Sequence, residues 1–152
     1  MVILAMYKGK GNIANSLIRW RTDSIYSHCE FIIDGMWYSS TVEDHGVVKR
    51  NRREKNNFHD EDWDYFPLPW LPDSWVIDYF EETQEQPYGW LDLIQSQLVG
   101  RATRNDVGDF CSEWMAACAK LPNPQEFSPR KLMEVLLWRC QPTETLTNEH
   151  TP

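Results

Sequence analysis

The sequence predicts an α+β domain, because short β-like runs occupy most of its first half and segments with helical periodicity occupy its second half. The chain has 152 residues, of which 41% are hydrophobic and 13% aromatic. A chain of this size buries about 70% of the surface that its unfolded form exposes, so it needs neither disulfides nor a structural metal to fold. We expect residues 1–140 to form one domain and residues 141–152 to form a disordered tail, since the tail has almost nothing to bury.

Strands are expected in five places: residues 2–7, 26–33, 36–41, 47–48 and 63–66. The alternation within the second run places Cys29 on a core face and both His28 and Glu30 on the opposite face. Asp34-Gly35, which follows that run, is typical of a hairpin turn. The sequence therefore predicts antiparallel pairing of the second and third strands.

Helices are expected over residues 13–20, 73–82, 87–98, 110–121 and 129–138. Pro72 precedes the second of these helices, and Ser128-Pro129 opens the last one, as is common at helix starts. The charged residues 50–62 lack periodicity, and we expect them to form a solvated loop rather than a basic patch.

Charge and cysteine content exclude several classes of protein. The formal net charge is −8, so the chain has no general attraction for phosphate backbones or anionic headgroups, and nucleic acid is not expected as a partner. No window offers the roughly 18 apolar residues that a membrane span needs, and the apolar start lacks the features of a signal peptide. We therefore expect a soluble protein that stays in the cytoplasm unless an assembly exports it.

The four cysteines are too few and too irregularly spaced for a disulfide scaffold or a structural zinc site, which favours a reducing compartment.

Cys111 follows a Gly-Asp turn and begins a run with helical periodicity. The positive end of a helix dipole stabilises a thiolate, so this position favours a reactive thiol, although position alone fits an inert core cysteine equally well. His28 is a candidate base, because Glu30 on the same strand face can fix the tautomer of its ring. A His-x-Glu pair on a strand is also common as an ordinary surface pair.

Several separated segments carry a family resemblance. They are Ser27-His28-Cys29-Glu30, residues 34–40 (DGMWYSS), Pro87-Tyr88-Gly89-Trp90 and Phe110-Cys111-Ser112-Glu113-Trp114. In their residues and in their order along the chain, these segments resemble the circularly permuted branch of the NlpC/p60 papain-like cysteine peptidases. That branch includes YiiX-like bacterial proteins and lecithin-retinol acyltransferase-like proteins. The histidine strand precedes the cysteine helix, as that branch requires. The resemblance implies a permuted papain-like fold, with a small antiparallel sheet or partial barrel packed against several helices.

The same resemblance implies that Cys111 is the nucleophile and His28 its general base, with the backbone N–H of Cys111 holding the oxyanion. Glu30 is expected to be the third polar residue, but related branches take that residue from the following strand. The polar residues there are Ser39, Ser40, Glu43 and His45. The accessory candidates are Tyr26, Tyr88 and Ser112. No cofactor is implied.

The sequence thus predicts a thiol hydrolase that cleaves an amide or peptide bond through an acyl-enzyme, with bacterial cell-wall peptide as the leading substrate class. A lipid-ester hydrolase or acyltransferase of the same fold is the nearest alternative, and a non-catalytic binding or assembly module is an alternative of a different class. A metal site is not expected, because no His or Cys pair has the spacing typical of metal ligands. A bacterial or phage-encoded protein, delivered by a phage or secretion assembly, fits these features.

Overall fold

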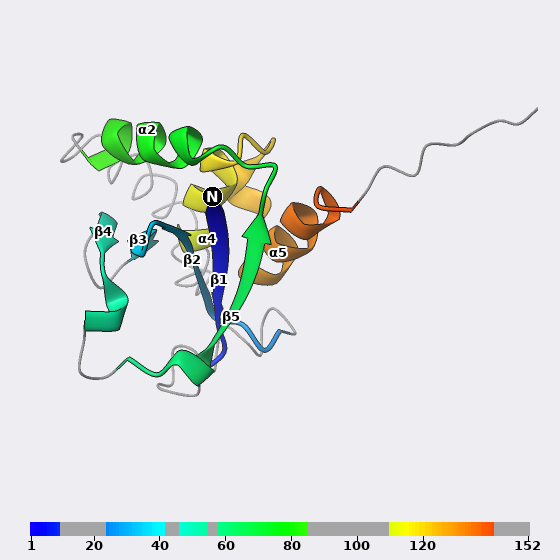
Figure 1. The fold of residues 1–152 in the computed structure, drawn as a ribbon. Helices are drawn as coiled ribbons and strands as arrows, with labels where there is room; N and C mark the ends of the chain where they lie inside the picture. The colour runs from blue at the N-terminus through cyan, green and yellow to red at the C-terminus, as the bar shows by residue number, and fades with distance from the viewer. Residues whose placement is uncertain (10–23, 42–45, 55–57, 85–109, 142–152) are drawn as a thin grey trace, which may run out of the picture.

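The structure is a computed structural model that describes residues 1–9, 24–41, 46–54, 58–84 and 110–141. Over these residues the chain is α+β, with one five-stranded antiparallel sheet and three α-helices (Figure 1). The predicted helices at 13–20 and 87–98 and the predicted tail after residue 141 lie outside the described residues. The predicted α+β class and antiparallel sheet are confirmed.

The strands are β1 (Val2–Tyr7), β2 (His28–Ile33), β3 (Met36–Thr41), β4 (Gly46–Arg50) and β5 (Trp63–Leu68), and their order in the sheet is β4-β3-β2-β1-β5. The predicted hairpin between β2 and β3 is confirmed. Its turn residues Asp34 and Gly35 have φ values of 49° and 80°, and positive φ at both positions matches the twist of the flanking strands. β2 lies in the middle of the sheet, so both of its edges are paired.

The helices are α2 (Asp73–Gln84), α4 (Phe110–Cys118) and α5 (Pro129–Trp138), and the short 3-10 helices are η1 (Arg52–Glu54), η2 (Asp60–Asp62) and η3 (Pro124–Glu126). The prediction that Ser128 and Pro129 open the last helix is confirmed, and the Ser128 side chain accepts a hydrogen bond from the Lys131 N–H. This bond satisfies one of the N–H groups that a helix start leaves without an intrahelical partner.

Helix α4 ends three residues earlier than the sequence predicts. Lys120 has a φ of 52°, in the left-handed region, and the N–H of Leu121 bonds to the carbonyl of Ala116 while the N–H of Lys120 bonds to that of Ala117. These two bonds are those of a Schellman motif, which satisfies the last carbonyls of the helix. The apolar periodicity continues to Leu121 because that residue packs back on the core after the helix has ended.

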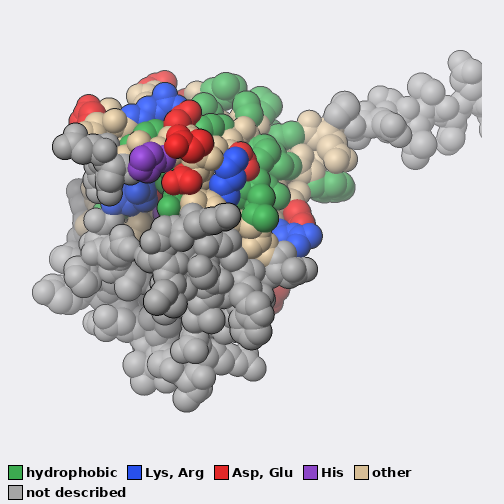
Figure 2. Space-filling model, turned by 90° about the horizontal axis from the view of Figure 1, so that it is seen from below, with side chains coloured by type: hydrophobic (Ala, Val, Ile, Leu, Met, Phe, Trp, Pro, Cys, Tyr) green, Lys and Arg blue, Asp and Glu red, His purple; other side chains and the backbone are tan. Residues whose placement is uncertain are grey.

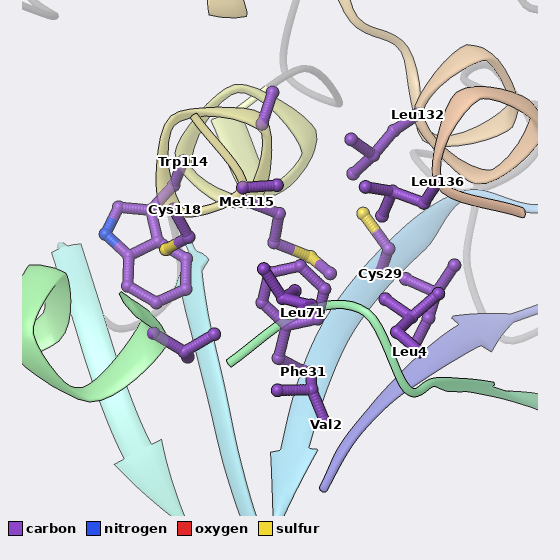
Figure 3. Close-up of a cluster of buried hydrophobic side chains, with 14 of the residues drawn as sticks. Val2, Leu4, Cys29, Phe31, Leu71, Trp114, Met115, Cys118, Leu132 and Leu136 are labelled. Atoms are coloured by element: carbon purple, nitrogen blue, oxygen red, sulfur yellow. The ribbon is translucent and has the colours of Figure 1, made fainter. Parts of the chain in front are cut away.

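The main core lies between the sheet and helices α4 and α5, while α2 crosses the end of the sheet where β1 begins (Figure 1). Phe31 of β2 points toward Met115 of α4, and Leu132 and Leu136 of α5 close the same cluster (Figure 3). A second cluster covers the other face of the sheet. Its buried members are Ala5, Ile32, Trp37 and Trp63. Both faces of β2 are therefore buried, including the face on which the sequence predicts ionisable groups.

Among the described residues, no helix is long and apolar enough to cross a membrane.

The end of α4 provides a test of this fold. Lys120 carries the left-handed backbone, and its ammonium also lies 3.9 Å from the centre of the Trp75 ring. Lys120→Gly and Lys120→Ala both remove that contact, but only glycine adopts a left-handed backbone without steric cost. We expect the glycine variant to be more stable than the alanine variant by about 1 kcal/mol. Urea denaturation followed by tryptophan fluorescence measures this difference, and equal stability would contradict the assigned helix end.

Candidate active site

Cys111 is the second residue of α4 and is 3% exposed. Helix α4 packs on β2 and β3, and the start of the helix lies beside the first residues of β2. There the Cys111 sulfur lies 3.7 Å from the sulfur of Cys29, and the Cys29 thiol donates a hydrogen bond to it. The predicted nucleophile is thus a buried thiol at a helix start, beside a second thiol.

His28 is the first residue of β2, and its ring connects Cys111 with Glu30. The Nε2 atom of His28 lies 2.8 Å from Oε1 of Glu30, and the ring is also a hydrogen-bond partner of Cys111. Because Nε2 faces the carboxylate, we assign Nδ1 to the thiol. The side chain of His28 is 20% exposed, so it is the more open member of the pair.

Glu30 is fully buried and accepts hydrogen bonds from three cationic side chains. Its Oε1 atom is bonded by His28, by Arg50 Nη2 at 3.3 Å and by Arg52 Nη2. Arg50 ends β4 and Arg52 begins η1, so the chain after β3 folds back over this face of the sheet. A buried carboxylate needs such partners, because an isolated charge in the interior is strongly destabilising.

The prediction of a solvated loop at residues 50–62 is wrong for Arg50 and Arg52. Their side chains are only 17% and 21% exposed, and both bond to Glu30. The sequence contained one signal for this arrangement, since a carboxylate within a buried strand requires cationic partners from somewhere in the chain. Sequence alone could not say which of the charged residues would supply them.

The electrostatics of the site favour an imidazolium and a carboxylate. Burial disfavours the charged form of His28, but the Cys111 thiolate, together with the hydrogen bonds to Cys111 and Glu30, raises the pKa of His28 to about 9. Burial also opposes ionisation of Glu30, but its hydrogen bonds to Arg52 and His28 hold the pKa of Glu30 far below its ordinary range. At neutral pH both groups are charged.

The two thiols are shifted in opposite directions. The hydrogen bond from Cys29 and the positive charge of His28 outweigh burial and hold the pKa of Cys111 well below its ordinary value. Burial and the negative charge on Cys111 raise the pKa of Cys29 well above its ordinary value. The pair therefore consists of a thiolate at Cys111 and a protonated thiol at Cys29.

The aromatic ring of Trp63 contacts both His28 and Arg52, on the face of the sheet that carries the second hydrophobic cluster. The His28 and Trp63 rings meet edge to face with centroids 6.3 Å apart, and the Arg52 guanidinium lies 5.3 Å from the Trp63 ring centre. The Trp63 ring also packs against the rings of Tyr7 and Trp37, with ring centroids 5.0 and 4.9 Å from its own. Such contacts restrict the rotamers of His28 and Arg52.

Two accessory candidates from the sequence have structural partners elsewhere. The Tyr26 hydroxyl donates to Oδ2 of Asp64 at 2.7 Å, and burial together with this bond raises the pKa of Tyr26 to about 12. The Ser112 hydroxyl donates to the backbone carbonyl of Phe127. Tyr88 lies outside the described residues.

Two of the alternatives for the third polar residue, Ser39 and Ser40, lie in β3. Ser39 donates to the backbone carbonyl of Cys29 at 3.3 Å, and Ser40 is buried in β3. Glu43 and His45 lie outside the described residues. Within the part of the chain that the structure describes, Glu30 is the carboxylate bonded to His28.

Other charged side chains among the described residues are exposed. Figure 2 shows acidic, basic and histidine side chains close together on one face. Exposed ion pairs of the described residues include Arg53–Asp60 at 3.2 Å, and pairs of this kind contribute little to stability. Among the described residues, no group of three or more His, Cys, Asp or Glu side chains could hold a metal ion.

Comparison of the chain with protein-family models, with curated proteins and with solved structures finds no match. The family resemblance therefore stays a prediction, carried by its four segments.

The buried carboxylate gives a stability prediction. Glu30→Gln keeps the shape of the side chain but removes the charge that compensates Arg50 and Arg52, and breaking a buried ion pair costs about 3–5 kcal/mol. We expect a loss of that size at pH 7, measured by urea denaturation. The matched control Glu81→Gln, at an exposed position of α2, should change stability by less than about 0.5 kcal/mol.

The stability difference between wild type and Glu30→Gln should depend on pH. Because the pKa of Glu30 is lower in the folded chain than in the unfolded chain, its stabilisation is fully present above about pH 4.3 and is lost as the pH falls below that value. The stability gap between wild type and Glu30→Gln should therefore narrow in acid. A gap that stays constant down to pH 3 would contradict an ionised, paired Glu30.

Proposed function

We propose that the protein is a thiol hydrolase in which Cys111 is the nucleophile, His28 the general base and acid, and Glu30 the group that orients the imidazole. One observation carries this proposal: His28 is hydrogen-bonded to the Cys111 thiol on one side and to Glu30 at 2.8 Å on the other. A nucleophile, a base and an orienting carboxylate in this sequence of contacts are the requirements for acyl transfer.

The chemistry follows from the charge state of the pair. The Cys111 thiolate attacks the carbonyl carbon of an amide or ester, and the oxyanion forms near the start of α4, where the helix dipole is positive. The His28 imidazolium then gives its proton to the departing amine or alcohol, which leaves a thioester on Cys111. In the second half, neutral His28 takes a proton from water, and the resulting hydroxide attacks the thioester carbonyl. The C–S bond breaks, the carboxylic acid leaves, and Cys111 returns as a thiolate beside the His28 imidazolium.

The buried charges support the anionic nucleophile. The carboxylate of Glu30, which also bonds to Arg50 and Arg52, stabilises the imidazolium form of His28. The positive charge of His28 in turn favours the anionic form of Cys111. In an interior of low effective dielectric such interactions between charges are stronger than in water.

Access to the site is from the histidine side. Cys111 is 3% exposed and Cys29 is fully buried, whereas 20% of the His28 side chain reaches solvent. A substrate carbonyl would therefore approach past the His28 ring and the Trp63 ring beside it.

The leading substrate class is a peptide or amide, with bacterial cell-wall peptide as the first choice. Its support is the resemblance to the permuted NlpC/p60 branch, in which the segments around His28 and Cys111 occur in the same order. The lecithin-retinol acyltransferase-like members of that branch make a lipid ester or an acyl-transfer reaction the second choice. A bacterial or phage-encoded enzyme fits both.

Alkylation by iodoacetamide tests the reactive pair without a substrate. We expect Cys111 to be modified at pH 6 at least about ten times faster than the exposed Cys140 of the same molecule, because the pKa of Cys111 is held well below its ordinary value. Peptide mapping by mass spectrometry separates the two rates. In His28→Ala, Cys111 should no longer be alkylated faster than Cys140. The matched control His59→Ala, at an exposed position, should keep the faster alkylation of Cys111.

The opposite result has a definite meaning. If Cys111 is alkylated more slowly than Cys140 and is indifferent to His28, the thiol is an inert core residue and the protein is a binding or assembly module with this fold.

The pH–rate profile tests the role of Glu30. Activity on an amide or ester should fall at high pH with an apparent pKa near 9, because the reaction requires the His28 imidazolium. Glu30→Gln should move this alkaline limb to lower pH by about one unit, since it removes an anion that stabilises the imidazolium. Glu81→Gln should leave the limb in place. An alkaline limb that Glu30→Gln does not move would refute the orienting role.

A further inference from the structure

Two thiols, rather than one, lie at the centre of the site. The sulfur atoms of Cys29 and Cys111 are 3.7 Å apart, and both residues belong to the main core. Hydrolysis through Cys111 requires His28 and Glu30 but gives no chemical task to Cys29. The neighbouring thiol is therefore a nucleophilic group that the proposed reaction does not use.

The fold holds these two sulfurs toward each other. Cys29 comes from the central strand β2 and points toward the helix layer (Figure 3), while Cys111 comes from the start of α4, which packs on that strand. A disulfide has a sulfur–sulfur distance of about 2.05 Å, so the two atoms need to close by less than about 2 Å. Side-chain rotation and a small shift of α4 are sufficient for a movement of that size.

We propose that Cys29 and Cys111 form a reversible disulfide when Cys111 is oxidised by a hydroperoxide, and that this bond is a redox modification site of the protein. It shares with the proposed function only the reactive Cys111 thiolate. The bond occupies the nucleophile, so the oxidised chain is inactive as a thiol hydrolase until a dithiol reduces it.

The reaction balances in two steps. The Cys111 thiolate attacks the terminal oxygen of the hydroperoxide, its O–O bond breaks, the other oxygen leaves with a proton as water or an alcohol, and Cys111 becomes a sulfenic acid. The Cys29 sulfur then attacks the Cys111 sulfur, the S–O bond breaks, and the hydroxide takes the Cys29 proton to leave as water. The two sulfurs together lose two electrons, which reduce the peroxide.

The two thiols are suited to different steps. Cys111 is the thiolate of the pair, and thiolates are the form that peroxide oxidises. Cys29 is protonated while Cys111 is negative, because that negative charge is one cause of its raised pKa. Conversion of Cys111 to an uncharged sulfenic acid removes this cause, so Cys29 becomes easier to deprotonate when it is needed as the resolving thiol.

The test treats the full chain with a modest excess of hydrogen peroxide, then unfolds it, alkylates the remaining thiols and digests it without reductant. We expect two of the four cysteines to become resistant to alkylation, a cross-linked peptide that joins Cys29 to Cys111, and recovery of all four thiols after dithiothreitol. Cys111 found as sulfinic or sulfonic acid, with Cys29 still alkylated, would overturn the proposal.

Variants distinguish the partner of Cys111. Cys29→Ser should abolish the cross-link and leave the sulfenic acid of Cys111 open to a second equivalent of peroxide, which gives a sulfinic acid that dithiothreitol does not reduce. Cys118→Ser is the matched control, because Cys118 is a buried cysteine of the same helix, and it should leave the cross-link intact. The cross-link in the wild-type chain is decisive even where Cys29→Ser fails to fold.

The two proposals fail in different experiments. A Cys29–Cys111 cross-link in a chain that hydrolyses neither amide nor ester substrates supports the redox pair and refutes the hydrolase. Fast, His28-dependent alkylation of Cys111 in a chain that peroxide converts only to a sulfinic acid supports the hydrolase and refutes the redox pair.

Discussion

The ionised carboxylate of Glu30, buried in the middle of the sheet, is the interaction on which the site depends. Removing a carboxylate from water costs several kcal/mol unless cationic partners surround it, so the folded chain must bring positive charges to β2. Arg50 and Arg52 supply them from the strand and turn that follow β3, and His28 supplies a third from β2 itself. The same ion pairs that stabilise the buried Glu30 carboxylate also hold the end of β4 and η1 beside the site. The bond between Glu30 and His28 fixes which ring nitrogen of His28 faces the thiol.

Strand β2 contributes side chains to both faces of the sheet, and this alternation places the residues of the site. Its side chains alternate, so Cys29 points to the helices while His28 and Glu30 belong to the opposite side. His28 is the first residue of the strand, at the end of the sheet, and there its ring meets Cys111 at the start of α4. One strand therefore provides the base, its orienting carboxylate and a second thiol, and one helix start provides the nucleophile. Hydrolysis and disulfide formation would compete for that nucleophile.

Local signals in the sequence predicted most of the described elements. An apolar run predicted β1 and alternation predicted β2, the Asp34-Gly35 dipeptide predicted the hairpin, and Ser128-Pro129 predicted the start of α5, because each of these features depends on a few neighbouring residues. The end of α4 was predicted too late. Leu121 continues the apolar period after Lys120 has turned the backbone left-handed, and periodicity reports burial rather than backbone conformation.

By itself the sequence determined the α+β class, the alternation that puts His28 and Glu30 together, and the placement of Cys111 at a helix start, since all three follow from spacing along the chain. The tertiary structure alone decided that Glu30 is fully buried and that Arg50 and Arg52 are its partners. It also decided that Cys29 lies against Cys111. These pairings join residues from different elements, and such distances depend on how the sheet and helices pack, which no local pattern encodes.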